Sequence, residues 1–208
     1  ALASGIDGLC VTDHGTLDGA IALARIAPPE VEVVVGCELD ASDGSQVLAL
    51  NVKRVIAPRP LFELFAAIKA QGGLVLLPHP FRRGSGVFRP ERRRSRGFFD
   101  DALGQADLVE CFNGRDIYDN NRRNAAFASQ DDVAVVAGSD AHTAGEVGSV
   151  YVEYLERPFT HGVTQRKIWF ADQAPRRESS ARRAMMELYH RSQRRLPSAV
   201  DSSYHVSR

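Results

Sequence analysis

The chain has 208 residues, of which 44% are hydrophobic and 25% are charged, a composition typical of one ordinary globular domain with a sizeable core. Its formal net charge is zero, which gives no global indication of a nucleic-acid or membrane partner, and no apolar run approaches the roughly 18–20 residues that a membrane-spanning helix needs. The cysteines Cys10, Cys37 and Cys111 lie in or beside apolar runs, so we expect reduced core thiols in a cytoplasmic protein.

Short apolar runs rich in β-branched residues predict the strands. They cover residues 8–12, 31–36, 46–52, 74–77, 107–111 and 133–137, and residues 149–155 add a further, more exposed strand. Helical patterns lie between several of these runs. Thr16 can cap a helix over 17–27, Pro60 can open one over 61–71, and the pattern at 116–129 indicates a third. Strands that alternate with helices predict a parallel α/β sheet or barrel.

Polar side chains follow the strands at their C-terminal ends. Five strands run into Asp13 and His14, Glu38, His79, Asn113, and the pair Asp140 and His142. In a parallel barrel these ends meet on one face, where the active sites of this architecture form. Imidazole nitrogens and carboxylate oxygens are the ligands that suit zinc, manganese or iron ions. A convergent set of these side chains would bind such ions, and its members are His14, Glu38, His79, Asp140 and His142.

Five motifs, in this order along the chain, resemble the PHP (polymerase and histidinol phosphatase) family: VTDHGTLDG, VVVGCELDA, LVLLPHPFR, LVECFNG and GSDAHTAGEVG. The resemblance implies an α/β fold, a distorted TIM-like (β/α)7 barrel with metal ions at its mouth. It also implies metal-dependent hydrolysis of phosphomonoesters or phosphodiesters. We expect a PHP-like hydrolase domain over 1–170 and an Arg- and Ser-rich helix and tail over 171–208.

The resemblance also assigns roles to individual residues. His14, Glu38, His79, Asp140 and His142 match metal-ligand positions of the family, which implies a cofactor of divalent metal ions (Zn, Mn or Fe), two of which we expect. Candidate catalytic groups are His14, Asp140 and His142, and His142 or Asp13 is the candidate proton donor to the leaving alkoxide. We expect Asp13, Glu110 and Asn113 to contact the ligands rather than the metal. For Glu110, a purely structural hydrogen-bonding role is the alternative.

Two departures from the family pattern concern the number of metal ions. The family begins with a strand that ends in an H-x-H pair, upstream of the TDH element, and this sequence starts after that point. We therefore expect an N-terminally truncated barrel: either the chain is a fragment, or two ligands and a strand have been lost. Three-metal members often carry a further histidine near the stretch that corresponds to residues 44–52, and this chain has none there. A full three-metal site is not expected.

Residues 82–96 are dense in arginine. Arg82 and Arg83 directly follow the HPF segment, and guanidinium groups bind phosphate through paired hydrogen bonds, so either side chain is a candidate clamp for the substrate phosphate. For Arg92–Arg96 we expect a solvated, mobile loop. The run contains one aromatic residue, Phe88, which makes it a weak platform for nucleic acid.

The sequence thus predicts a metal-dependent phosphoesterase that acts on a small phosphorylated metabolite or a nucleotide through a metal-activated water, with no membrane partner. Two alternatives stay open. The first is a catalytically inactive PHP-fold module with a structural or interaction role. The second keeps the fold but hydrolyses a C–N bond, as amidohydrolases do. The exact substrate and the oligomeric state are left open by the sequence.

Overall fold

The computed structural model describes residues 1–128, 134–154 and 166–170. The chain divides into two compact units, Ala1–Val109 and Glu110–Arg208, each with strands and helices of its own. The helix and tail predicted over 171–208 lie outside the described residues, and the expected domain boundary at residue 170 stays a prediction. Within the described ranges, no helix is long and apolar enough to cross a membrane.

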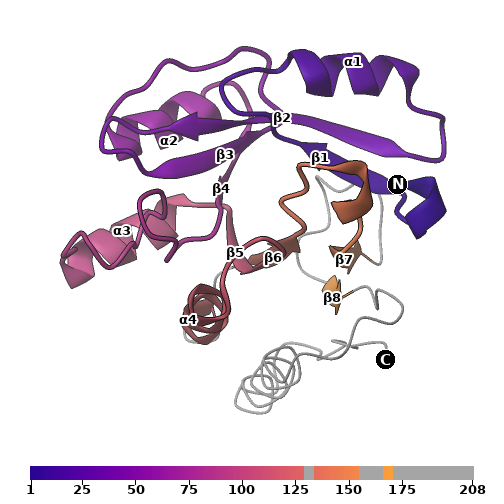
Figure 1. Ribbon diagram of the computed structural model, residues 1–208. Helices are drawn as coiled ribbons and strands as arrows, with labels where there is room; N and C mark the ends of the chain where they lie inside the picture. Colours follow the sequence, from indigo (N-terminus) through magenta and orange to yellow (C-terminus); the bar gives the residue numbers. More distant parts are fainter. Residues whose placement is uncertain (129–133, 155–165, 171–208) are drawn as a thin grey trace. The chain divides into compact units, whose positions relative to one another are not determined.

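The first unit alternates strands with helices, except that β3 follows β2 directly (Figure 1). Its elements are the 3-10 turn η1 (Leu2–Ser4), β1 (Gly8–Val11), α1 (Asp18–Ile26), β2 (Glu32–Asp40), β3 (Gln46–Leu50), α2 (Leu61–Lys69), β4 (Leu74–Leu77) and α3 (Arg96–Gln105), and β5 (Leu108–Asn113) begins in it. β1 and β2 pair in parallel, with Gly8 opposite Glu32. β3 runs antiparallel to both β2 and β4, and β4 pairs in parallel with the start of β5.

The direction of β3 corrects the all-parallel sheet that the alternation predicts. The short segment Ala41–Ser45 connects β2 and β3. Within it, the Ala41 amide donates to the Ser45 carbonyl at 2.8 Å, and Gly44 takes a left-handed φ of 78°. A connection this short forms a hairpin, because parallel strands need a crossover of roughly a dozen or more residues. The fold is therefore α/β with a mixed sheet, and the closed (β/α)7 barrel stays a prediction.

Helix α2 covers the core of the first unit. Its buried side chains recur at helical spacing, and they are Leu61, Leu64, Phe65 and Ile68. The strands contribute the fully buried side chains of Leu50, Val75 and Leu77. The segment after the helix passes close to β3, because a Cβ at Gly73 would lie 2.8 Å from the carbonyl oxygen of Leu50. The helix predicted over 61–71 is thus confirmed.

The other predicted helices are also found, and one helix was not predicted. α1 lies along β2 (Figure 1). At the start of α1, the Thr16 hydroxyl accepts from the amide of Asp18, the first residue of the helix, at 3.1 Å. α4 (Tyr118–Ala128) matches the pattern at 116–129. Helix α3 was missed, because its N-terminus lies in the arginine-rich run where we expected a loop. Ser95 caps it, with its side-chain oxygen accepting from the Phe98 amide at 3.2 Å.

The second unit continues β5 and adds α4 (Tyr118–Ala128), β6 (Val135–Gly138), the 3-10 turn η2 (Ala144–Glu146), β7 (Val150–Tyr154) and β8 (Arg166–Phe170). β6 lies next to β5 in the strand order, and β7 pairs with β8 in an antiparallel arrangement. The sequence predicts β7 but not β8. The buried side chains of Cys111 and Val150 form a small core, with Phe112, Val135, Ala137 and Val152 packed against it.

All three cysteines are free, but they differ in exposure. Cys37 and Cys111 are buried, as predicted, and burial raises the pKa of the Cys37 thiol to about 11. This supports a core thiol, not a metal ligand, at position 37. Cys10 is exposed, which corrects the expected core position. It shares the exposed side of β1 with Gly8, because alternate residues of a strand face the same side.

Candidate metal centre

The end of β1 lies beside the end of β2 in the first unit. Their parallel register continues beyond both paired segments to an isolated bridge between His14 and Glu38. The Gly15 amide donates to the Glu38 carbonyl at 2.9 Å, and the Glu38 amide donates to the Asp13 carbonyl at 3.2 Å. The backbone of two neighbouring segments therefore holds these two predicted ligands side by side.

The ring of His14 contacts two carboxylates. Its Nδ1 lies 3.3 Å from Glu38 Oε2, and its Nε2 lies 2.9 Å from Asp40 Oδ2. The hydrogen bond with Glu38, helped by the negative charge of Asp40, raises the pKa of His14. Sequence reasoning missed Asp40, although a usable signal was present. Asp40 follows Glu38 by two residues, and residues two apart on a strand face the same side.

His79 contacts the same glutamate. It follows β4 by two residues, it is only 2% exposed, and its Nε2 lies 3.4 Å from Glu38 Oε1. Glu38 thus contacts His79 through one carboxylate oxygen and His14 through the other. Burial alone would raise the pKa of Glu38, but the contacts with His79 and His14 outweigh it and lower that pKa. The carboxylate is therefore held in the ionised form that metal ligation requires.

The four side chains His14, Glu38, Asp40 and His79 form what we call the strand-end cluster. Two imidazoles and two carboxylates are donors that suit Zn, Mn or Fe. Two donors that each lie about 2.1 Å from one ion at a tetrahedral angle are about 3.4 Å apart. The observed contacts, from 2.9 to 3.4 Å, are of that size. No group of three or more such side chains in the described ranges is arranged to hold an ion as it stands, so the ligand roles stay predictions.

The backbone is strained at two of the predicted ligand positions. His79 has a φ of 30° and Asp140 a φ of 50°, in the left-handed region. This conformation costs a residue other than glycine about 1–3 kcal/mol and concentrates at functional sites. The third such residue in the described part of the chain, Asn51, directly follows β3. The strain supports a functional role for positions 79 and 140.

In the second unit, Asp140 and His142 lie together on the loop after β6. His142 Nδ1 is 2.9 Å from the Asp140 carbonyl oxygen and 3.7 Å from Asp140 Oδ1. Glu146, which sequence reasoning missed, fixes this loop: its carboxylate accepts from the amides of His142 at 2.8 Å and Thr143 at 3.0 Å. Arg115 pairs with Glu146 at 2.9 Å. The loop therefore presents an exposed His142 side chain in a defined conformation. A joint site of all five predicted ligands stays a prediction.

Glu110 and Asn113 hold the end of β5. Both are buried, and Asn113 Nδ2 donates to Glu110 Oε2 at 3.0 Å. The Asn121 side chain accepts from the Asn113 amide at 2.9 Å and donates to its carbonyl at 2.8 Å. A Cβ at Gly138 would lie 2.9 Å from Glu110 Oε1, so Glu110 packs against the backbone that leads to Asp140. These contacts show a structural hydrogen-bonding role, and contact with metal ligands stays a prediction.

Asp13, expected to contact the ligands, packs its carboxylate against Gly19 in the first turn of α1, where a Cβ would collide with it. A carboxylate near a helix N-terminus is stabilising, which favours a structural role. Of the two candidate phosphate-binding arginines, Arg82 donates its amide to the His79 carbonyl at 2.8 Å. The Arg83 side chain is 76% exposed and lies 3.5 Å from Glu91. The phosphate clamp stays a prediction for both arginines.

The expectation of a solvated side chain is wrong for Arg94, which is 18% exposed, whereas Arg92 is exposed as expected but is held by a contact with the hairpin. Together with Arg89 they contact Asp43 in the β2–β3 hairpin, and we call these four residues the Asp43 cluster. Arg89 is 4% exposed and donates to the Ser45 hydroxyl at 2.8 Å. Arg92 Nη2 donates to the Asp43 carbonyl at 2.8 Å, and Arg94 donates to the Asp43 carboxylate. The partners are 46 to 51 residues apart in the sequence, so no local pattern indicates the contact.

The family described as PHP-associated matches residues 119–163 of the chain. The fold is similar to that of Endonuclease Q in complex with a duplex substrate that has an abasic lesion at the active site (TM-score 0.57, 12% identity, 99% of this chain and 68% of that chain). It is also similar to a protein assigned as a metal-dependent phosphoesterase from Bifidobacterium adolescentis (TM-score 0.52, 16% identity, 70% and 80%). The family match and these two folds are consistent with a PHP-family protein. The resemblance that the five sequence motifs carry is thereby confirmed.

Two uncharacterized proteins of Methanocaldococcus jannaschii are relatives of this chain. One is 30% identical over 129 residues, and the other is 34% identical over 85 residues. The chain covers 52% and 48% of their lengths, so it spans about half of the curated relatives that it matches. An amidohydrolase from Chromobacterium violaceum with bound sulfate and no metal shares the fold as well (TM-score 0.50, 14% identity, 71% of this chain and 81% of that chain).

Proposed function

We propose that this chain is a PHP-family, metal-dependent hydrolase that cleaves a phosphoester bond with a water activated at the strand-end cluster. The observation that carries the proposal is the contact of Glu38 with both His14 and His79, at the ends of β2, β1 and β4. Imidazole nitrogens and carboxylate oxygens are donors that suit Zn, Mn or Fe. The distances from the Glu38 oxygens to the nitrogens of His14 and His79 are of the size expected for two donors that share an ion. The fold shared with a protein assigned as a metal-dependent phosphoesterase supports the same chemistry.

A bound divalent ion supplies a hydroxide at neutral pH and draws negative charge from the phosphoryl oxygen. In this proposal His14, Glu38 and His79 would hold the ion, and Asp140 and His142 keep the ligand roles that the sequence motifs predict for them. His14 uses one ring nitrogen for the ion while a carboxylate holds the other, which fixes its tautomer and orientation. The proton for the leaving alkoxide would come from Asp13 or from His142, the latter only where its exposed ring is not bound to the ion. Arg82 or Arg83 binds a phosphate oxygen.

Two substrate classes are supported to different degrees. Endonuclease Q, whose structure aligns with 99% of this chain, is bound to a nucleic-acid duplex, which supports a nucleotide or nucleic-acid ester. A small phosphorylated metabolite is the other class. The amidohydrolase with the same fold supports C–N hydrolysis as a second candidate function. A catalytically inactive module is the third possibility that the experiments below distinguish.

The first experiment measures metal binding by isothermal titration with Mn²⁺ and Zn²⁺. Glu38→Gln removes the carboxylate that joins the two imidazoles, and we expect the affinity to fall by at least about 10-fold. Glu32→Gln is the matched control, because Glu32 is the first residue of the same strand and lies at its opposite end. An unchanged affinity in Glu38→Gln, with the control also unchanged, would show that the proposed centre is wrong.

The second experiment measures hydrolysis of p-nitrophenyl phosphate, bis-p-nitrophenyl phosphate and p-nitroacetanilide by the same three proteins. We expect a phosphoester to be cleaved with added metal, no cleavage after chelation, and loss of activity in Glu38→Gln alone. Cleavage of the anilide alone would instead establish C–N hydrolysis. Tight metal binding without any hydrolysis would favour the inactive module.

A further inference from the structure

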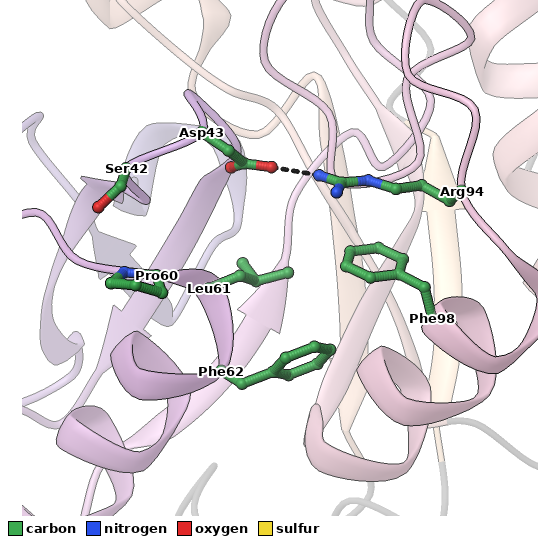
Figure 2. A pocket seen from close by; sticks show the side chains of 7 residues that line it. All are labelled: Ser42, Asp43, Pro60, Leu61, Phe62, Arg94 and Phe98. Carbon is green, nitrogen blue, oxygen red and sulfur yellow. Dashed lines mark hydrogen bonds and ion pairs between the residues drawn. The ribbon is translucent and has the colours of Figure 1, made fainter.

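A pocket of about 300 Å³ lies beside the β2–β3 hairpin, within the first unit (Figure 2). Its lining comes from the hairpin, the start of α2 and the start of α3, and consists of Ser42, Asp43, Pro60, Leu61, Phe62, Arg94 and Phe98. The Ser42 amide donates to the Arg59 carbonyl at 2.8 Å and so ties the hairpin to the segment before α2. The volume is at the small end of the range for ligand pockets, which suits one planar ring system.

One side of the pocket is aromatic. The rings of Phe62 and Phe98 are 5.6 Å apart between centroids and tilted by 56°. The guanidinium carbon of Arg94 lies 4.1 Å from the centroid of Phe98, in cation–π contact. Figure 2 shows the Asp43–Arg94 ion pair directly above the Phe98 ring and Leu61, with the Phe62 ring below them. Aromatic faces and guanidinium planes are the surfaces on which unpaired nucleobases stack.

The charged side of the pocket has a surplus of positive charge. The Asp43 cluster contains three guanidinium groups and one carboxylate. Burial by itself raises the pKa of Asp43, but hydrogen bonds from Ser45 and Arg94 outweigh it and lower that pKa, so the carboxylate stays ionised. The nearby Glu91 pairs with Arg83. Two of the three positive charges are therefore not balanced within the cluster, and the guanidinium fork matches a phosphate group.

The pocket and the strand-end cluster are joined by a short stretch of chain. Asp43 follows Asp40 by three residues, and a chain segment of that length spans at most about 10 Å. Arg94 lines the pocket and Arg92 contacts the same Asp43, so both guanidinium groups are available to a phosphate attached to that ring. The Cα atoms of Asp40 and Asp43 are at most about 10 Å apart. That distance is comparable to the length of one nucleotide.

We propose that this pocket binds the base of a nucleotide unit, that Arg92 and Arg94 bind its phosphate, and that the adjoining ester bond lies at the strand-end cluster. The last part rests on the proposed function, while the binding of base and phosphate does not. Of the Asp43 cluster, Arg89 is the structural member, because it is buried and its donors go to Ser45 and to the backbone. The side chain of Arg92 is 45% exposed and that of Arg94 is 18% exposed, which leaves both accessible to a ligand.

The test is equilibrium binding to the full chain with a chelator present, so that hydrolysis does not contribute. The probes are adenosine monophosphate, ribose 5-phosphate, which lacks the base, and adenosine, which lacks the phosphate. We expect adenosine monophosphate to bind at least about 10-fold more tightly than either fragment, because stacking and phosphate contacts each contribute. Equal affinities for adenosine monophosphate and ribose 5-phosphate, or no detectable binding of any probe, would overturn the proposal.

Two variants with matched controls locate the binding site. Phe98→Leu keeps an apolar side chain but removes the ring, and Arg92→Gln removes one exposed charge; each should weaken adenosine monophosphate binding by about 10-fold. Phe99→Leu is the aromatic control, because the Phe99 ring stacks on Phe88 rather than lining the pocket. Arg96→Gln is the charge control, since this side chain is 94% exposed. The melting temperature of each protein verifies folding. Equal losses in the variants and their controls would contradict this location.

The outcomes separate this inference from the proposed function. If adenosine monophosphate binds as expected but no phosphoester is cleaved, the pocket is established and the hydrolase is not. If nitrophenyl phosphates are cleaved while the base adds nothing to binding, the hydrolase stands and the nucleotide pocket is refuted.

Discussion

Asp43→Asn is expected to destabilise the first unit, because one carboxylate organises three arginines. The contact with Arg94 is a charge-assisted hydrogen bond between largely buried side chains, for which about 1.5–3 kcal/mol is typical. The pair with Arg92 is half exposed and contributes about 0–1 kcal/mol. Arg89 keeps its bonds to Ser45 and to the backbone. The expected loss is therefore about 2 kcal/mol, which lowers the melting temperature of a chain of this size by about 4–8 °C.

The loss should depend on pH in a defined direction. The folded-state pKa of Asp43 is lowered, so its stabilisation is complete above the ordinary carboxyl pKa near about 4 and disappears as the pH falls through the lower folded-state value. The asparagine variant lacks this stabilisation at every pH. The difference between wild type and variant should therefore be largest near neutral pH and shrink below about pH 4.

Urea unfolding followed by far-ultraviolet circular dichroism measures both effects. Fluorescence is unsuitable, because the single tryptophan, Trp169, lies in the second unit. The matched control is Asp100→Asn, whose partner Arg96 is 94% exposed and whose loss should stay below about 0.5 kcal/mol. If Asp43→Asn is as stable as this control at neutral pH, the Asp43 cluster does not stabilise the hairpin and the reasoning is refuted.

Three further predictions concern the core and the predicted site. Phe65→Ala removes a side chain that is 1% exposed and should lower the free energy of unfolding by about 3–5 kcal/mol. A loss below about 1 kcal/mol, measured by urea unfolding, would place Phe65 outside the core. At position 79, where φ is 30°, the glycine variant should be about 1 kcal/mol more stable than the alanine variant, and equal melting temperatures would show that the backbone is not strained there. Gly138→Ala should lower the free energy of unfolding by about 1–2 kcal/mol, because the new Cβ meets Glu110 Oε1. Gly145→Ala should leave it unchanged, because nothing lies within 4 Å of a Cβ built there. Similar thermal stability of the two variants would contradict the close packing at Glu110.

Much of the fold could be predicted from local patterns. The strand at 31–36 follows from a short apolar run rich in β-branched residues, and the helix at 61–71 follows from side-chain periodicity, which local backbone geometry dictates. The placement of His14 and Glu38 at strand ends is equally local, and the pairing of β1 with β2 brings the two side chains together. Their role as metal ligands stays a prediction. The antiparallel direction of β3 also had a local cause, because the hairpin at Ala41–Ser45 is too short for a crossover.

Asp40 shows the limit of reasoning from residue types alone. The sequence places it on the same strand face as Glu38, but only the pairing of β1 with β2 brings it to His14. Glu38 lies on β2 and His79 follows β4, and β3 lies between these strands in the sheet. Their contact therefore also depends on how the strands pair.

The Asp43 cluster and its pocket were decided by tertiary structure only. An arginine-rich run has the composition of a solvated loop, and nothing in its local pattern identifies a partner 46 to 51 residues away. Whether a guanidinium group is solvated or buried depends on which carboxylate the folded chain brings to it. Periodicity and turn length are properties of consecutive residues, and the sequence by itself therefore determined the elements and the residues at their ends. Ion pairs and pockets form between segments far apart in the chain, so only the packing of those segments determines them.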